Sequence, residues 1–451
     1  MPRVIRVALV SVRDLMLTFG PFVLIAIALL VAAYVVLDPT PPKRVVLATG
    51  PENTAYATWG ELYAAELRRY GIRVELRSTM GSLQNRRLLR DPKENVDVAF
   101  VQGGSSDPNP GSDDSKKVDM EDLVSLGTVA YDPVWIFYRA ESAKKLGKDA
   151  LVTGLPQMRG WRLNVGVRGS GTPGITSRIF AANFVERDEV KRSNLDETAA
   201  VVALLGGELD AAVLVSPPES QMVQMLLQTP GIRLYEYGQA ESYARRYPFL
   251  GPVALPRGVA DIARDVPPHE VPLIATTTSL LAREDIHPAL VQLFVQAASR
   301  IHSGPGWIAR AGTFPNPRQS EFPLAKDAAR YYQSGPPLLQ RYLPFWLANL
   351  IDRMWVALFS IIAVLIPLSR LVPPLYAFRI RSRVFRWYRN LRQIESDAGL
   401  HEKSPAELLA ALDRLEGRVA GIAVPLSYND ELYALRQHID LVRARLTKTR
   451  E

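Results

Sequence analysis

Residues 15–37 contain no charged side chain, and this run constrains the chain more than any other feature. A helix needs about 20 apolar residues to cross a bilayer core of roughly 30 Å, so the run is long enough to span a membrane. Three arginines precede it: Arg3, Arg6 and Arg13. By the positive-inside rule, residues 1–14 should lie in the cytoplasm and the chain after residue 37 outside it. A cleaved signal peptide is the alternative, but its apolar core is usually shorter.

A second apolar run covers residues 354–369, and residues 345–347 extend it upstream. The uncharged core is short, but Asp352 and Arg353 can snorkel to the outer interface. We therefore predict a second transmembrane helix over residues 345–369. A buried helix of a soluble domain is the alternative.

Residues 379–392 contain six arginines and no acid. Such a run can bind nucleic acid, but its position beside an apolar segment favours a basic juxtamembrane segment on the cytoplasmic side. No nucleic-acid partner is therefore expected. The predicted topology is two-pass, with both termini inside, the lipid bilayer as a partner and the main domain, residues 43–342, outside.

The region between the two runs alternates strand patterns with helix patterns. Strands are expected at residues 43–50, 72–76, 96–101, 161–167, 209–216 and 273–280, and helices at 54–70, 81–89, 175–185, 197–205 and 290–301. This alternation predicts an α/β fold with a mainly parallel sheet. With 451 residues in the chain, more than one compact unit is expected.

Two segments indicate that this domain has two lobes of similar construction. Residues 96–102 (VDVAFVQ) and 209–216 (LDAAVLVS) each have an aspartate that leads into an apolar strand with a polar end. Each half also has a Gly-Ser turn before a helix. We assign lobe 1 to residues of about 43–130 and 255–342, and lobe 2 to about 131–254. The alternative is that any strand–helix unit shares these features, so that they indicate no repeat.

Two lobes imply a cleft, and ligands of open α/β sheets bind beyond the carboxyl ends of the strands. Polar residues occur at those ends and at the starts of helices, where free N–H groups favour anions. Ser and Thr at such places are also ordinary helix caps. The candidate ligand-binding residues are Thr49, Tyr56, Ser82, Asn85, Gln102, Ser170, Gly171, Thr172 and Ser216. Tyr131 and Trp135 are expected in the core rather than in the cleft.

Four segments, in this order, resemble the TAXI-type solute receptors of TRAP transporters: residues 81–89 (GSLQNRRLL), 96–102 (VDVAFVQ), 164–172 (NVGVRGSGT) and 207–212 (GELDAA). The resemblance covers residues 43–302. It implies a type II periplasmic-binding-protein fold that closes around an organic acid or amino acid, and with the free N–H groups of the helix starts we expect this solute to be small and anionic. It also implies delivery to TRAP membrane subunits in separate chains, driven by an ion gradient. With the two flanking helices, the expected location is a bacterial inner membrane.

Residues 169–174 (GSGTPG) match a dinucleotide-binding pattern, and Asp196 lies downstream at a suitable distance. However, Pro173 stiffens the turn, and Asp196 has the features of a helix N-cap. The chain has no cysteine, and its five histidines are scattered. We therefore expect no enzyme activity, catalytic residue, metal ligand or cofactor.

Residues 393–451 are predicted to form a cytoplasmic helical hairpin. Ser404 and Glu407 form a capping box at the start of the first helix, whose apolar stripe is Leu408, Leu412, Leu415, Val419 and Ile422. The second stripe is Leu432, Leu435, Ile439, Val442 and Leu446. Such helices pack as a hairpin or self-associate. The tail leaves open a second function, that of a membrane-tethered sensor that signals to its cytoplasmic helices.

Overall fold

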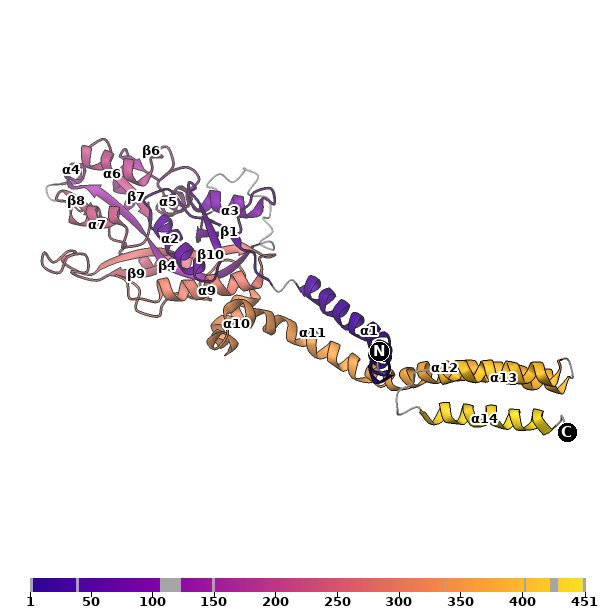
Figure 1. Ribbon diagram of the computed structural model, residues 1–451. Helices are drawn as coiled ribbons and strands as arrows, with labels where there is room; N and C mark the ends of the chain where they lie inside the picture. The colour runs from indigo at the N-terminus through magenta and orange to yellow at the C-terminus, as the bar shows by residue number, and fades with distance from the viewer. Residues whose placement is uncertain are drawn as a thin grey trace. The chain divides into compact units, whose positions relative to one another are not determined.

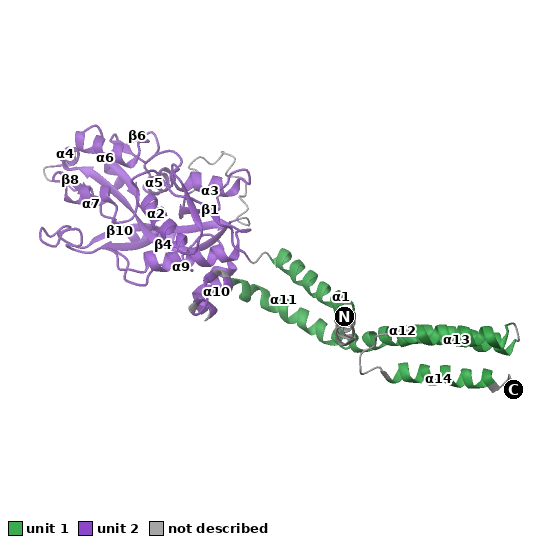
Figure 2. Ribbon diagram, in the orientation of Figure 1, with its two compact units in different colours: residues 1–39, 349–451 green, residues 40–348 purple. Residues whose placement is uncertain are grey.

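The computed structural model describes residues 3–37, 40–105, 123–147, 151–336, 338–400, 403–421 and 429–448. The chain divides into two compact units (Figure 2). The α/β domain is Thr40–Ala348, and the helical unit combines Met1–Pro39 with Asn349–Glu451.

The α/β domain is built on a mixed sheet covered by helices (Figure 1). The strand order is β2-β1-β3-β10-β4-β7-β5-β6, with β8 paired to β4 and β9 paired to β10. The first part of lobe 1 contains β1 (Arg44–Ala48), α2 (Ala55–Arg68), β2 (Arg73–Arg77), α3 (Ser82–Arg90) and β3 (Val98–Gln102). These three strands run parallel. β1 is apolar on both faces because Val45 and Leu47 enter one core and Val46 and Ala48 enter another.

Lobe 2 repeats this construction, with β5 parallel to both β6 and β7. Its elements are α4 (Ala140–Ala143), η3 (Lys144–Leu146), η4 (Leu155–Met158), β5 (Arg162–Asn164), α5 (Thr172–Ala182), β6 (Lys191–Ser193), α6 (Glu197–Gly206), β7 (Ala211–Val215), α7 (Gln221–Gln228), β8 (Ile232–Leu234), α8 (Ala240–Arg246) and β9 (Gly251–Leu255). The strand order is therefore the same in both lobes: β2-β1-β3 in lobe 1 and β6-β5-β7 in lobe 2. In each lobe the third strand pairs antiparallel with a long strand, β10 in lobe 1 and β4 in lobe 2.

Two long strands, β4 (Leu123–Arg139) and β10 (Val271–Arg283), pair antiparallel and run through both lobes. Leu126 of β4 lies in the lobe 1 core, and Trp135 lies fully buried in the lobe 2 core, as expected for a core residue. β10 begins in the lobe 2 core with Leu273 and reaches the lobe 1 core at Leu280. The chain thus returns to lobe 1 within β10, later than the expected position near residue 255.

The domain ends with α9 (Pro288–His302), α10 (Lys326–Ser334) and η5 (Leu338–Arg341). Pro288 occupies the first turn of α9, and the His287 side chain accepts a hydrogen bond from the amide of Ala289 at the helix start. α9 packs its apolar face into the lobe 1 core with α2.

The helical unit contains α1 (Arg3–Leu37), α11 (Phe345–Ser369), α12 (Val372–Gly399), α13 (Pro405–Ala420) and α14 (Asn429–Lys448). By length and composition, two helical stretches of the described chain could cross a membrane: Met16–Leu37, and one within Leu347–Gly399. At 1.5 Å per residue, the 25 residues of α11 extend over about 37 Å.

The C-terminal region is a cluster of three helices rather than the two-helix hairpin expected from the sequence. Leu412 and Leu415 of α13 and Ile439 of α14 pack with Ile380 and Leu391 of α12. The arginine-rich segment at residues 379–392 therefore belongs to a helix with one apolar face. The capping box is confirmed, since Ser404 and Glu407 exchange hydrogen bonds of 3.0 and 3.4 Å. Ile422 lies outside the described residues.

Candidate functional site

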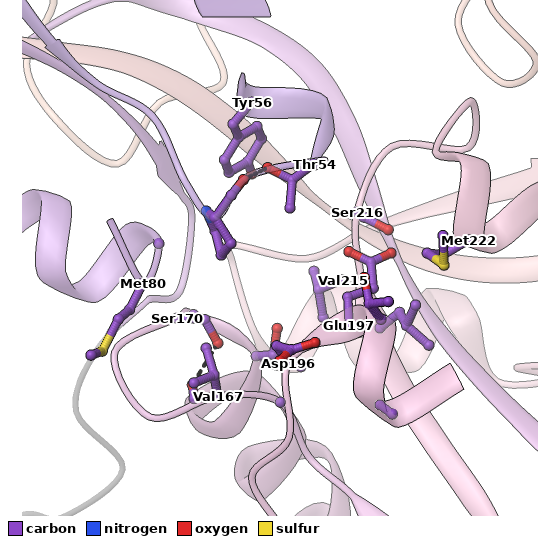
Figure 3. A pocket seen from close by; sticks show the side chains of 18 of the residues that line it. Thr54, Tyr56, Met80, Val167, Ser170, Asp196, Glu197, Val215, Ser216 and Met222 are labelled. Carbon is purple, nitrogen blue, oxygen red and sulfur yellow. Dashed lines mark hydrogen bonds between the residues drawn. The ribbon is translucent and has the colours of Figure 1, made fainter. Parts of the chain in front are cut away.

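A cavity of about 570 Å³ opens between the carboxyl ends of the lobe 1 strands and those of lobe 2 (Figure 3). Its wall includes Gln102 at the end of β3, Asn164 at the end of β5 and Ser216 just after β7. The N-terminal turns of α2, α3, α5 and α6 also line it. Because parallel strands are followed by helices that begin at the same edge, this edge gathers backbone N–H groups and positive dipole ends.

The structure brings most of the predicted residues to this cavity. Seven of the nine line it: Tyr56, Ser82, Gln102, Ser170, Gly171, Thr172 and Ser216. The other two, Thr49 and Asn85, do not. Tyr131 is half-buried rather than in the core as expected; it lines an adjoining hollow and packs on Phe314 with ring centroids 4.9 Å apart.

Asn85 is a structural amide of lobe 1. Its Nδ2 donates to the carbonyl oxygens of Thr49, at 2.5 Å, and Phe100, at 2.8 Å, and its Oδ1 accepts from the Thr79 hydroxyl. The side chain is fully buried, so it ties the start of α3 to the ends of β1 and β3. The Thr49 hydroxyl donates to the carbonyl of Arg77, and Thr49 does not line the cavity either. We therefore correct both assignments, because these polar groups satisfy backbone atoms instead of facing a ligand.

A buried carboxylate, Asp132 of β4, holds the lobe 1 wall together. Its Oδ2 accepts from the Tyr56 hydroxyl at 2.6 Å, from Gln102 Nε2 at 3.2 Å and from the Thr278 hydroxyl. Its Oδ1 is buried without a hydrogen bond to any described residue. Burial raises the pKa of Asp132 to about 6, although its three hydrogen bonds oppose the shift. The polar ends of Tyr56 and Gln102 are thus already engaged within the protein.

Three hydrogen bonds connect the lobes around the cavity. Gln102 Nε2 of lobe 1 donates to the carbonyl of Val215 at 2.8 Å. The amide of Gln84, in the first turn of α3, donates to the carbonyl of Gly169 at 3.0 Å. Arg178 of α5 donates to the carbonyl of Gly104 at 3.1 Å. The two lobes are therefore in direct contact beside the turn at residues 169–171.

The lobe 2 wall also contains acidic residues that are not among the candidates predicted from the sequence. Asp196 and Glu197 at the start of α6 line the cavity, and Glu52 of lobe 1 lines it as well. Asp196 is the N-cap of α6, since its Oδ1 accepts from the Ala199 amide at 2.8 Å; this agrees with the sequence expectation. Acids in a first turn are common on any helix, so sequence alone could not single out Glu197.

Glu197 is half-buried and shares its surroundings with two serines. Its Oε1 accepts from the Ser220 hydroxyl at 3.2 Å, and Ser216 lies beside it (Figure 3). The Ser216 hydroxyl is buried and makes no hydrogen bond of ordinary geometry to a described residue. Burial, and then the nearby charges of Asp132 and Asp196, raise the pKa of Glu197 to about 7. This carboxyl therefore titrates near neutral pH.

Two α/β lobes that share two crossing strands, with a cavity at the strand ends of both, define a type II periplasmic-binding-protein-like domain, the fold of solute-binding proteins. The chain belongs to the NMT1-like family, whose model matches residues 47–334.

No curated protein matches the sequence. Among solved structures, the aliphatic sulphonate binding protein SsuA from Escherichia coli is 13% identical, with a TM-score of 0.36, and the match covers 71% of this chain and 83% of that one. The alkanesulfonate-binding protein SsuA from Xanthomonas axonopodis pv. citri, bound to MOPS, is 14% identical, with a TM-score of 0.32, and the match covers 46% and 69%. A protein from Bordetella bronchiseptica RB50 is 13% identical, with a TM-score of 0.39, over 57% and 70%. Likenesses this distant carry no argument about ligand or role.

Proposed function

We propose that this protein is an extracytoplasmic receptor that captures a small solute by closure of its two lobes and serves a TRAP-type secondary transporter. The observation that carries the proposal is the cavity itself, which is lined by strand ends and helix starts from both lobes. A cavity of about 570 Å³ is in the range of small-molecule sites, and a hinge of two crossing strands permits closure on a ligand. The transporter assignment rests on the resemblance of the four sequence segments.

In this proposal, α1 and α11 anchor the receptor as two transmembrane helices, with the α/β domain outside and both termini in the cytoplasm. The arginines of α12 support the inward position of the C-terminus through the positive-inside rule. Accessibility labelling of single cysteines tests this topology cleanly because the chain has no native cysteine. A cysteine in place of Arg414 should react only after the membrane is permeabilised; reaction from outside would contradict the proposed orientation.

The receptor role is tested by thermal unfolding of the full chain in lipid nanodiscs with a panel of small metabolites. A solute at about 100 times its dissociation constant stabilises the native state by roughly 2.7 kcal/mol, which is a shift of a few degrees. The transporter role requires, in addition, that solute uptake into proteoliposomes with TRAP membrane subunits depends on this protein. A panel without any stabilising solute would argue against the receptor role.

The three-helix cluster favours a second candidate, a sensor that reports solute binding to the cytoplasm. It has its own apolar core in the same chain as the receptor domain, so it is a built structure rather than a disordered tail. Hydrogen exchange separates the two functions. A sensor should change the protection of amides in α13 and α14 when solute binds, whereas a transport receptor should change only the α/β domain.

A further inference from the structure

The charged side chains that line the cavity, among the described residues, are all acidic. Three carboxylate residues line the cavity, namely Glu52, Asp196 and Glu197, and no lysine, arginine or histidine does so among the residues that the structure describes. Arg168, on the Gly-rich turn, is the basic residue closest in sequence to the lining but is not part of it. A free anion would therefore meet helix N-termini but also three carboxylates, with no basic side chain among the described lining residues to balance them.

From this arrangement we infer that the solute carries a protonated amine, and that Glu197 and Asp196 receive it. Closure removes water from the carboxylate of Glu197, and an unpaired buried charge is costly, whereas an ammonium–carboxylate pair with hydrogen bonds compensates it. The hydroxyl of Ser216 beside Glu197 is a further unused acceptor for an N–H group. The inference rests on the proposed function, because it names the ligand class of the same cavity.

The N-terminal turns of α3 and α5 then face the rest of the solute. Their N-caps, Gly81 and Gly171, have no side chain to cap the first turn, so backbone N–H groups can meet a polar or carboxylate group. A zwitterion and a simple amine share the required ammonium group, whereas a dicarboxylate lacks it.

Three probe classes test the inference on the full chain: amines such as putrescine and ethanolamine, zwitterions such as glycine and glutamate, and dicarboxylates such as succinate. We expect at least one amine or zwitterion to raise the midpoint of thermal unfolding. Calorimetry should then show its affinity falling about tenfold or more in Glu197→Gln. Asp196→Asn should weaken binding as well while keeping the α6 cap, since Asn caps as well as Asp.

Glu61→Gln is the matched control. Glu61 lies exposed on α2 and does not line the cavity, so the same loss of charge there should leave affinity unchanged. Stabilisation by dicarboxylates alone, or amine binding that is equal in wild type and Glu197→Gln, would overturn the inference and leave the receptor role intact. If no probe of any class binds, the inference and the receptor role both fail.

Discussion

In lobe 1, Asp97 precedes β3 and pairs with Val46 of β1; in lobe 2, Asp210 precedes β7 and pairs with Arg162 of β5. Each aspartate amide donates to the carbonyl of its partner, at 3.1 and 2.9 Å, and each carboxylate accepts the partner's amide, at 2.7 and 2.8 Å. The two lobes thus use the same device to join the first and third strands. The difference is that Arg162 also brings its guanidinium to Asp210, with contacts of 3.1 and 3.0 Å.

The walls of the cavity differ more than the scaffolds. On the lobe 1 side, Tyr56 and Gln102 are held by Asp132 and are occupied within the protein. On the lobe 2 side, Glu197 and Ser216 retain unused hydrogen-bonding capacity at the cavity. The comparison teaches that similar lobes can carry different walls: the lobe 1 side chains Tyr56 and Gln102 are bonded within the protein, and in the proposed function Glu197 and Ser216 of lobe 2 contact the solute.

The largest expected effect comes from removing the aspartate that joins the first and third strands of each lobe. Asp210→Ala should lower the free energy of unfolding by about 4 kcal/mol because it leaves the Arg162 amide and the Ser142 hydroxyl without their acceptor and removes the ion pair with the half-exposed Arg162 guanidinium. Asp97→Ala leaves the Val46 amide without its acceptor and should lower the free energy of unfolding by about 2 kcal/mol. Urea denaturation of the full chain measures both. Equal losses would show that neither the guanidinium of Arg162 nor the hydroxyl of Ser142 adds to the stability of lobe 2.

The hydrogen bonds of Asp210 should also make the free energy of unfolding depend on pH in the acid range. Burial alone would raise the pKa of Asp210, but hydrogen bonds from Arg162 and Ser142 outweigh it and lower the pKa to about 2. The stabilisation is therefore present above pH 4 and lost as the pH falls towards 2, by about 2 kcal/mol. Asp210→Asn should remove this part of the acid sensitivity.

The next effect concerns the rigid wall of lobe 1 and has the opposite sign. Asp132 has a folded pKa of about 6, above its ordinary value, so the native state loses stability as the pH rises from about 4 to about 6. The difference corresponds to roughly 3 kcal/mol. Relative to wild type, Asp132→Asn should gain stability over this interval, measured by urea denaturation at pH 4 and pH 6.5. A constant difference between the two proteins would contradict the account of Asp132.

The smallest effect tests how closely the two walls approach each other. A Cβ at Gly171 of lobe 2 would lie 2.6 Å from Gln102 Oε1 and 3.1 Å from Ser105 Cβ of lobe 1. Gly171→Ala should therefore hinder closure and weaken solute binding about tenfold, or about 1.4 kcal/mol, by calorimetry. Gly206→Ala is the control because nothing lies within 4 Å of its Cβ position. Unchanged affinity in Gly171→Ala would show that binding does not need this contact.

Much of the scaffold followed from the sequence, because apolar strands and helix starts are local patterns. The paired Asp-strand segments predicted two lobes, and seven of the nine residues predicted from strand ends and helix starts line the cavity. The length of β4, which runs through both lobes, was not predicted. A strand that passes from one hydrophobic core to another has no single burial pattern along its sequence. Asn85 was placed among the candidates although it binds backbone atoms, and Glu197 was not considered although it lines the cavity. Both have one reason: a polar residue near the start of a helix can contact backbone, solvent or ligand, and only three-dimensional packing distinguishes these roles.

The central claim is that the two lobes close on a solute held between them. Spin labels at Glu61→Cys on α2 and Val202→Cys on α6 would report the distance between lobe 1 and lobe 2, and both positions are exposed. We predict that a stabilising solute shortens and narrows the distance distribution measured by double electron–electron resonance, and that Gly171→Ala weakens this response. A distribution that stays the same while calorimetry shows the solute bound would contradict closure as the mechanism of capture.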